Sequence, residues 1–163
     1  MLIQTYVDVA LVGPFENCAG LSKEQRSEQA EWLKTAADLG ESLAMIEYSR
    51  DIADNDIAID FLNRAWKTGD IEALPFLAKR YGQSYESGEN PQNKVRAYST
   101  FYAYNQLIRA GLEGHGDIAS RWVKRNQIEL DQLEKTLHQH EIEQGRELAE
   151  QLVQSNENCC IRM

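Results

Sequence analysis

Two stretches of the chain decide its fold: WLKTAADLGESLA, Trp32–Ala44, and FLNRAWKTGDIEA, Phe61–Ala73. They align at an offset of 29 positions, which is the separation of Gly40 from Gly69. The matched pairs are Trp32 with Phe61, Leu33 with Leu62, Ala36 with Ala65, Gly40 with Gly69, Glu41 with Asp70, and Ala44 with Ala73. A repeat period of roughly 20–50 residues is typical of a protein built from stacked supersecondary units.

Each copy has the pattern of one helix, a glycine turn and the start of a second helix. Gly40 and Gly69 stand where the first helix of each copy ends, and glycine readily takes the left-handed conformation that closes a helix. The paired alanines, among them Ala65 and Ala73, are small enough for two helices to cross closely. A unit of this size cannot bury its apolar face alone, so we expect the two copies to stack on each other.

Apolar residues recur at helical spacing along the rest of the chain, and no stretch alternates as a half-buried strand does. We therefore predict an all-α protein. Helix starts are indicated by a capping box at Ser22–Gln25 and by Asp56, Asp70 and Asp117 as N-cap residues. The predicted helices lie near 2–11, then in pairs at 23–38 and 42–53, 57–67 and 71–86, and 94–110 and 118–136, with a last helix near 140–154.

The second copy continues the pattern beyond Ala73, and its signature residues are Ala58, Phe61, Leu62, Ala65, Gly69, Asp70, Ala73, Leu77, Ala78, Tyr81, Tyr85 and Gly88. At these residues the chain resembles the Sel-one-like repeat family, which is related to the tetratricopeptide repeats. The first copy matches in fewer positions, and a third unit opens at Val95–Tyr98. Gly145–Ala149 resembles the family's C-terminal capping segment. The alternative is an unrelated helical bundle in which alanine and glycine happen to coincide.

The resemblance implies a short α/α solenoid of antiparallel helix pairs with a C-terminal capping helix. It would form one domain over 1–155, with repeats at about 22–53, 56–88 and 94–136, a cap at about 139–154 and a flexible tail at 156–163. Members of the family mostly act as scaffolds or adaptors for other proteins, often in bacterial envelope or signalling assemblies. The expected function is therefore to bind a partner protein or peptide, and the family implies no catalytic residue set, so an enzyme is not expected. An exported assembly factor or effector of the same fold, and a metal-dependent hydrolase, are the alternatives.

Composition argues against two kinds of partner. The formal net charge is −9, which repels nucleic acid and anionic lipid surfaces. No run approaches the roughly 18 apolar residues of a membrane span. The apolar opening segment has no basic lead-in and does not resemble a signal peptide, which favours a cytoplasmic protein, with a periplasmic or secreted one as the alternative. The sequence does not decide the oligomeric state.

We expect neither a metal nor a cofactor. The three cysteines, Cys18, Cys159 and Cys160, form no C-x-x-C pair. His138 and His140 are two positions apart, so on a regular helix they point about 200° away from each other and cannot share an ion. The pattern favours a turn into the last helix instead. Neither a glycine-rich phosphate loop nor a nucleophile elbow is present.

The best candidate for a binding surface in the sequence is one flank of the helix predicted at 94–110. If Ala97, Phe101, Tyr104 and Ile108 face the core, the opposite flank carries Tyr98, Tyr102, Asn105 and Arg109. Tyrosine and arginine are favoured in binding hot spots. On the preceding helix, Asn63, Arg64 and Lys67 would extend the same partner-binding groove. The alternative is that the tyrosine rings pack against a neighbouring repeat.

Overall fold

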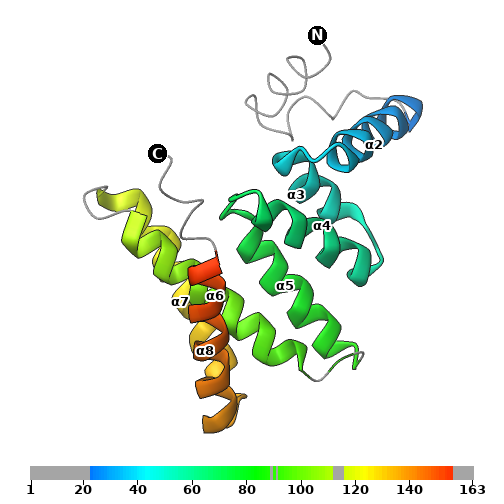
Figure 1. Ribbon diagram of the computed structural model, residues 1–163. Helices are drawn as coiled ribbons and strands as arrows, with labels where there is room; N and C mark the ends of the chain where they lie inside the picture. The colour runs from blue at the N-terminus through cyan, green and yellow to red at the C-terminus, as the bar shows by residue number, and fades with distance from the viewer. Residues whose placement is uncertain (1–22, 89, 91, 112–115, 156–163) are drawn as a thin grey trace.

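The computed structural model describes residues 23–155 except 89, 91 and 112–115 (Figure 1). Within this part the chain forms helices and no strands, which confirms the all-α prediction. The helices are α2 Lys23–Asp38, α3 Ser42–Asp51, α4 Asn55–Lys67, α5 Ala73–Glu86, α6 Asn93–Gly111, α7 Gly116–Glu134 and α8 Gln139–Ser155. Their ends lie within about two residues of the predicted ones. The predicted helix at 2–11, the capping box at Ser22, the cysteines and the tail at 156–163 lie outside the described residues.

The glycine turns of the two copies have the same geometry. Gly40 and Gly69 adopt φ angles of 94° and 96°. In each copy the amide after the glycine donates to the carbonyl five residues before it, at 3.0 Å in the first copy and 3.3 Å in the second. These bonds satisfy carbonyls that the helix end would otherwise leave without a partner. The repeated sequence therefore produces a repeated turn.

The helix caps correct two predictions. Asp54, not Asp56, is the N-cap of α4: its backbone is extended, and its carboxylate accepts the amides of Asp56 and Ile57. The carboxylate of Asp70 accepts the amide of Glu72 at 3.0 Å, but α5 begins at Ala73, so Asp70 stabilises the turn before the helix. In both places an aspartate side chain reaches an amide two residues further on, and this local contact sets the start. The side chain of Asp117 lies outside the described residues.

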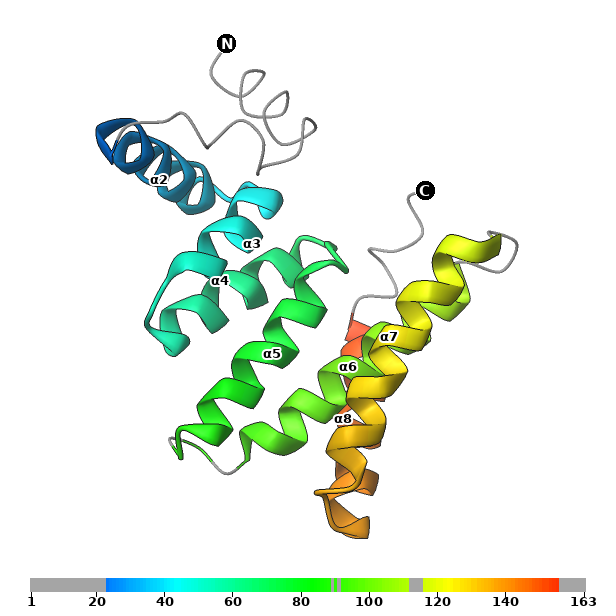
Figure 2. The same ribbon diagram turned by 180° about the vertical axis from the view of Figure 1, so that it is seen from behind.

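The apolar core has two parts, and α6 belongs to both. The first part contains residues from each of the five helices from α2 through α6, among them Leu62, Leu74 and Tyr104. The second joins α6 to α7 and α8 through residues such as Phe101 and Leu130. Figures 1 and 2 show α8 and α7 on opposite sides of α6, which is therefore covered from several directions.

Consecutive helices pack against each other from α2 to α6, and two arginines add contacts between corresponding helices of the two copies. Arg64 of α4 donates to the carbonyls of Ala37 and Asp38 at the end of α2, at 3.1 and 3.4 Å. Arg80 of α5 donates to carbonyls at the end of α3, including that of Ile52 at 2.8 Å. A cation is favourable at a helix C-terminus, where carbonyls carry partial negative charge.

Candidate functional site

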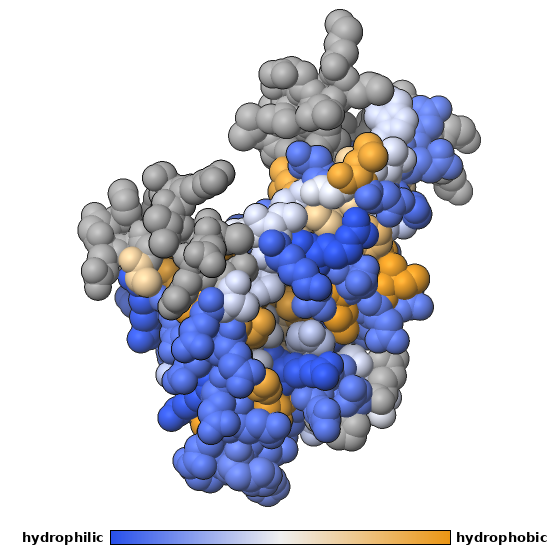
Figure 3. Space-filling model, viewed as in Figure 1, coloured by the Kyte–Doolittle hydropathy of each residue, from blue (hydrophilic) through white to orange (hydrophobic). Residues whose placement is uncertain are grey.

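The described residues contain an open groove of about 260 Å³ between α4, α5, α6 and α8. One residue of α4 and two of α5 meet three residues of α6 and four of α8. The lining residues are Asn63, Leu77, Tyr81, Arg96, Ser99, Thr100, Leu148, Gln151, Leu152 and Ser155. In Figure 3 the surface over α8 is mostly hydrophilic, with apolar surface showing beside it. The groove combines three leucines with amide, hydroxyl and guanidinium groups.

Two hydroxyls of α6 line the inner part of the groove. Ser99 and Thr100 are 2% and 1% exposed, and both hydroxyls donate to the backbone carbonyl of Arg96, at 2.9 and 2.8 Å. Because each hydroxyl hydrogen is used within the helix, what these side chains offer a ligand is oxygen lone pairs.

Among the described residues that line the groove, only Arg96 is charged. Its guanidinium carbon lies 5.8 Å from the centroid of the Tyr81 ring, within the range of a cation–π interaction. The Arg96 side chain is exposed and, among the described residues, has no carboxylate within ion-pair distance. The groove therefore presents one guanidinium that stacks on an aromatic ring and has no anionic partner.

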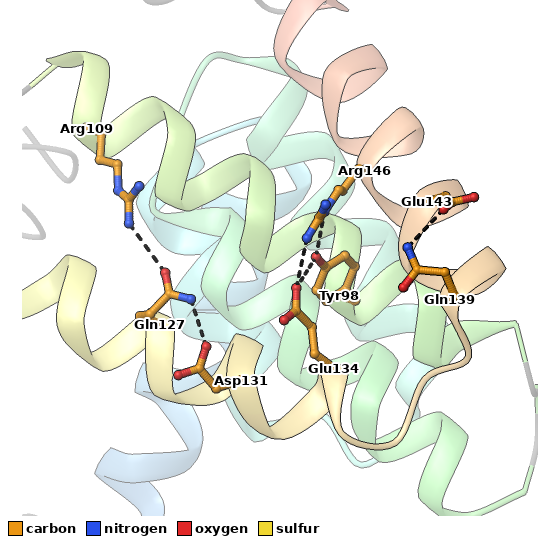
Figure 4. Close-up of polar contacts among 8 residues, drawn as sticks. All are labelled: Tyr98, Arg109, Gln127, Asp131, Glu134, Gln139, Glu143 and Arg146. Carbon is orange, nitrogen blue, oxygen red and sulfur yellow. Dashed lines mark hydrogen bonds and ion pairs between the residues drawn. The ribbon is translucent and has the colours of Figure 1, made fainter.

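Two residues of the predicted binding flank are buried, so the prediction that the flank is open to a partner is wrong for them. Tyr98 is fully buried, and its hydroxyl donates to Glu134 of α7 at 2.7 Å and accepts from Arg146 of α8 at 3.3 Å (Figure 4). Burial, and after it the hydrogen bond to Glu134, raise the pKa of Tyr98 from its ordinary value of 10.0 to about 12. The alternative, in which tyrosine packs on neighbouring helices, is the one observed for Tyr98.

Asn105 is the second buried residue, at 4% exposure. Among the described residues, neither atom of its side-chain amide has a hydrogen-bond partner, and the amide nitrogen of Asn126 on α7 has none either. Tyr102 is half-buried, with the guanidinium of Arg146 over its ring at 5.7 Å. Arg109 is exposed and donates to Gln127 at 3.4 Å (Figure 4). The flank is thus mainly a contact surface for α7 and α8.

Of the three residues of α4 that were predicted to bind a partner, one lines the groove and two do not. Asn63 is half-buried and lines the groove. The Arg64 guanidinium donates to the carbonyl of Ala37 at the end of α2, and its carbon lies 5.0 Å from the centroid of the Phe61 ring. Lys67 is exposed and does not line the groove. Only Asn63 therefore joins the site, and whether the other two contact a partner stays a prediction.

The sequence interpretation missed the residues of α6 that do line the groove. Arg96, Ser99 and Thr100 are spaced as i, i+3 and i+4, which places them together on one helix face. That polar stripe was visible in the sequence. The signal was weak, because small hydroxyl residues at helical spacing are equally common on a solvated face.

The two histidines lie where the sequence predicted the turn into the last helix. Their rings stack, with centroids 5.9 Å apart and an interplanar angle of 8°. The Glu141 carboxylate accepts the backbone amide of His138 at 2.7 Å, as the second half of a capping box does, and this bond lowers the pKa of Glu141. In the part of the chain that the structure describes, no three His, Cys, Asp or Glu residues could together hold a metal ion.

None of the helices within the described ranges is both long and apolar enough to cross a bilayer. Comparisons with known protein families, with curated proteins and with solved structures found no match to this chain.

Proposed function

We propose that this chain is a short α/α solenoid of the Sel-one-like type that binds a segment of a partner protein in the groove between α4, α5, α6 and α8. The observation that carries the proposal is the groove itself. Four helices contribute apolar, amide and hydroxyl groups to a hollow that the side chains of the described residues leave open. Such a mixture suits an extended peptide, which needs apolar contacts for side chains and hydrogen bonds for its backbone.

The repeated contacts support the solenoid arrangement. Both copies end their first helix in the same glycine turn. Arg64 links α4 to α2, and Arg80 links α5 to α3, so each helix of the second copy contacts its counterpart in the first. Stacking of equivalent helices is how a repeat protein buries its apolar faces. In this arrangement α6 and α7 form the third pair and α8 is the cap.

The chemistry of the groove favours binding over catalysis. Among the described lining residues, the ionisable side chains are the guanidinium of Arg96 and the phenol of Tyr81, and neither group is among the most frequent general bases. Ser99 and Thr100 donate their hydroxyl protons to a backbone carbonyl. In the part of the chain that the structure describes, no His or carboxylate that could activate these hydroxyls lines the groove. Oriented hydroxyls and amides of this kind are typical of a recognition surface.

The test uses a displayed library of random dodecapeptides selected on the full chain. Gln151 is exposed and lines the groove, so Gln151→Trp should fill it without disturbing the core. The matched control is Gln154→Trp, on the same helix and exposed, but outside the groove. Selected peptides should bind Gln151→Trp about tenfold or more weakly and bind the control as they bind the unmodified protein. Failure to select any peptide, or equal binding to both variants, would overturn the proposal.

A further inference from the structure

We infer that the groove recognises a partner segment in which an isolated Asp or Glu side chain sits beside an apolar residue. The inference rests on the proposed function and names the chemistry of its ligand. The carboxylate would pair with the guanidinium of Arg96, and the apolar side chain would pack on Leu77, Leu148 and Leu152, which line the same groove.

The first step is the charge of the groove. The chain as a whole carries a net charge of −9, yet the lining residues that the structure describes include one cation and no anion. Arg96 has no carboxylate partner in the described ranges, although the chain contains 26 acidic residues. A guanidinium without an internal partner can form its ion pair with an incoming carboxylate, and can do so with two parallel hydrogen bonds.

The second step is the position of the guanidinium. It lies over the Tyr81 ring, at 5.8 Å from the ring centroid, and that contact limits the rotamers open to a long side chain. Less side-chain entropy is then lost when a ligand binds. The hydroxyls of Ser99 and Thr100 offer only lone pairs, so the donors for a peptide carbonyl include the amides of Asn63 and Gln151 and the hydroxyl of Tyr81.

The third step explains why the acid should be isolated. The exposed side of α8 carries Glu143, Glu147 and Glu150, close in sequence to the groove residues Leu148 and Gln151. A run of acids in the partner would place several negative charges within a Debye length of these side chains, about 10 Å at moderate salt. A single carboxylate that reaches Arg96 gains an attractive pair while avoiding most of that repulsion.

The experiment compares peptides selected from the random dodecapeptide library on the unmodified protein. The selected pool should be enriched in sequences with one Asp or Glu next to Leu, Ile, Val or Phe. A synthetic peptide from the pool should bind Arg96→Gln about tenfold more weakly, and the same peptide with Gln in place of its acid should lose a similar factor on the unmodified protein. Arg109→Gln is the matched control, because Arg109 is an exposed arginine of the same helix outside the groove, and it should leave the affinity unchanged.

A charge exchange separates recognition from a loss of structure. If the ion pair between Arg96 and the peptide carboxylate exists, Arg96→Glu should bind a peptide that carries Lys in place of its acid. If substitution of Arg96 only disturbs the groove, this exchanged peptide will not bind Arg96→Glu. Peptides that depend on Gln151 but show no acidic enrichment, or that bind Arg96→Gln and Arg109→Gln equally, would overturn this inference and leave the proposed function standing. A pool that ignores Gln151→Trp would overturn both.

Discussion

Replacing Gly145 of α8 with alanine tests how tightly α8 is packed on α6. A Cβ atom at this position would lie 2.5 Å from Cδ1 of the Tyr98 ring, whereas ordinary contacts are 3.4–4 Å. The ring would have to move by about 1 Å, but it is fully buried and its hydroxyl is held by Glu134 and Arg146. Overpacking of this kind typically costs about 1–3 kcal/mol.

The matched control is Gly82→Ala in α5. Both glycines lie inside helices, so both substitutions gain about 1 kcal/mol of helix propensity. A Cβ atom at Gly82 would meet nothing within 4 Å. The free energies of unfolding of the two variants, measured by urea denaturation, should therefore differ by about 1–3 kcal/mol, with Gly145→Ala the less stable. Equal stabilities, or a more stable Gly145→Ala, would refute the packing of α8 described above.

Three further substitutions or conditions give separate tests. Ala73 is fully buried where α5 begins, so Ala73→Leu should lower the free energy of unfolding by about 1–3 kcal/mol, and an unchanged urea midpoint would contradict the close approach of the helices there. Asn105→Leu should raise the free energy of unfolding by about 1 kcal/mol, because it removes a buried amide that has no partner among the described residues; a loss of stability would show that the amide is satisfied. The free energy of unfolding should fall as pH rises from the ordinary tyrosine pKa of 10.0 toward about 12, because Tyr98 ionises at a lower pH in the unfolded chain than in the folded one. Urea denaturation over this pH range should show a smaller fall in the free energy of unfolding for Tyr98→Phe.

The helices and their turns could be predicted because their signals are local. A helix end depends on a glycine and a few neighbouring carbonyls, so Gly40 and Gly69 marked two turns correctly. The caps were less certain for the same reason: Asp54 and Asp56 are two residues apart, and either could accept an amide at the start of α4.

The binding flank could not be predicted, because helical spacing shows which residues share a face and not how many other helices cover it. A helix with one apolar stripe would leave Tyr98 and Asn105 on its open side. In this protein α6 contacts α5, α7 and α8 together, so both residues are covered. The groove could not be predicted either. It is formed by side chains from four helices, and the spacing of residues within one helix does not show how separate helices are placed.

The central claim is that a partner peptide binds between α4, α5, α6 and α8. The most direct test is to add a selected peptide and to map the amide chemical-shift changes by NMR. The account predicts that the largest changes cluster at groove residues from separate helices, among them Asn63, Thr100 and Gln151. Changes centred instead on Arg109, which belongs to the flank that the sequence favoured, and on its hydrogen-bond partner Gln127 would contradict it.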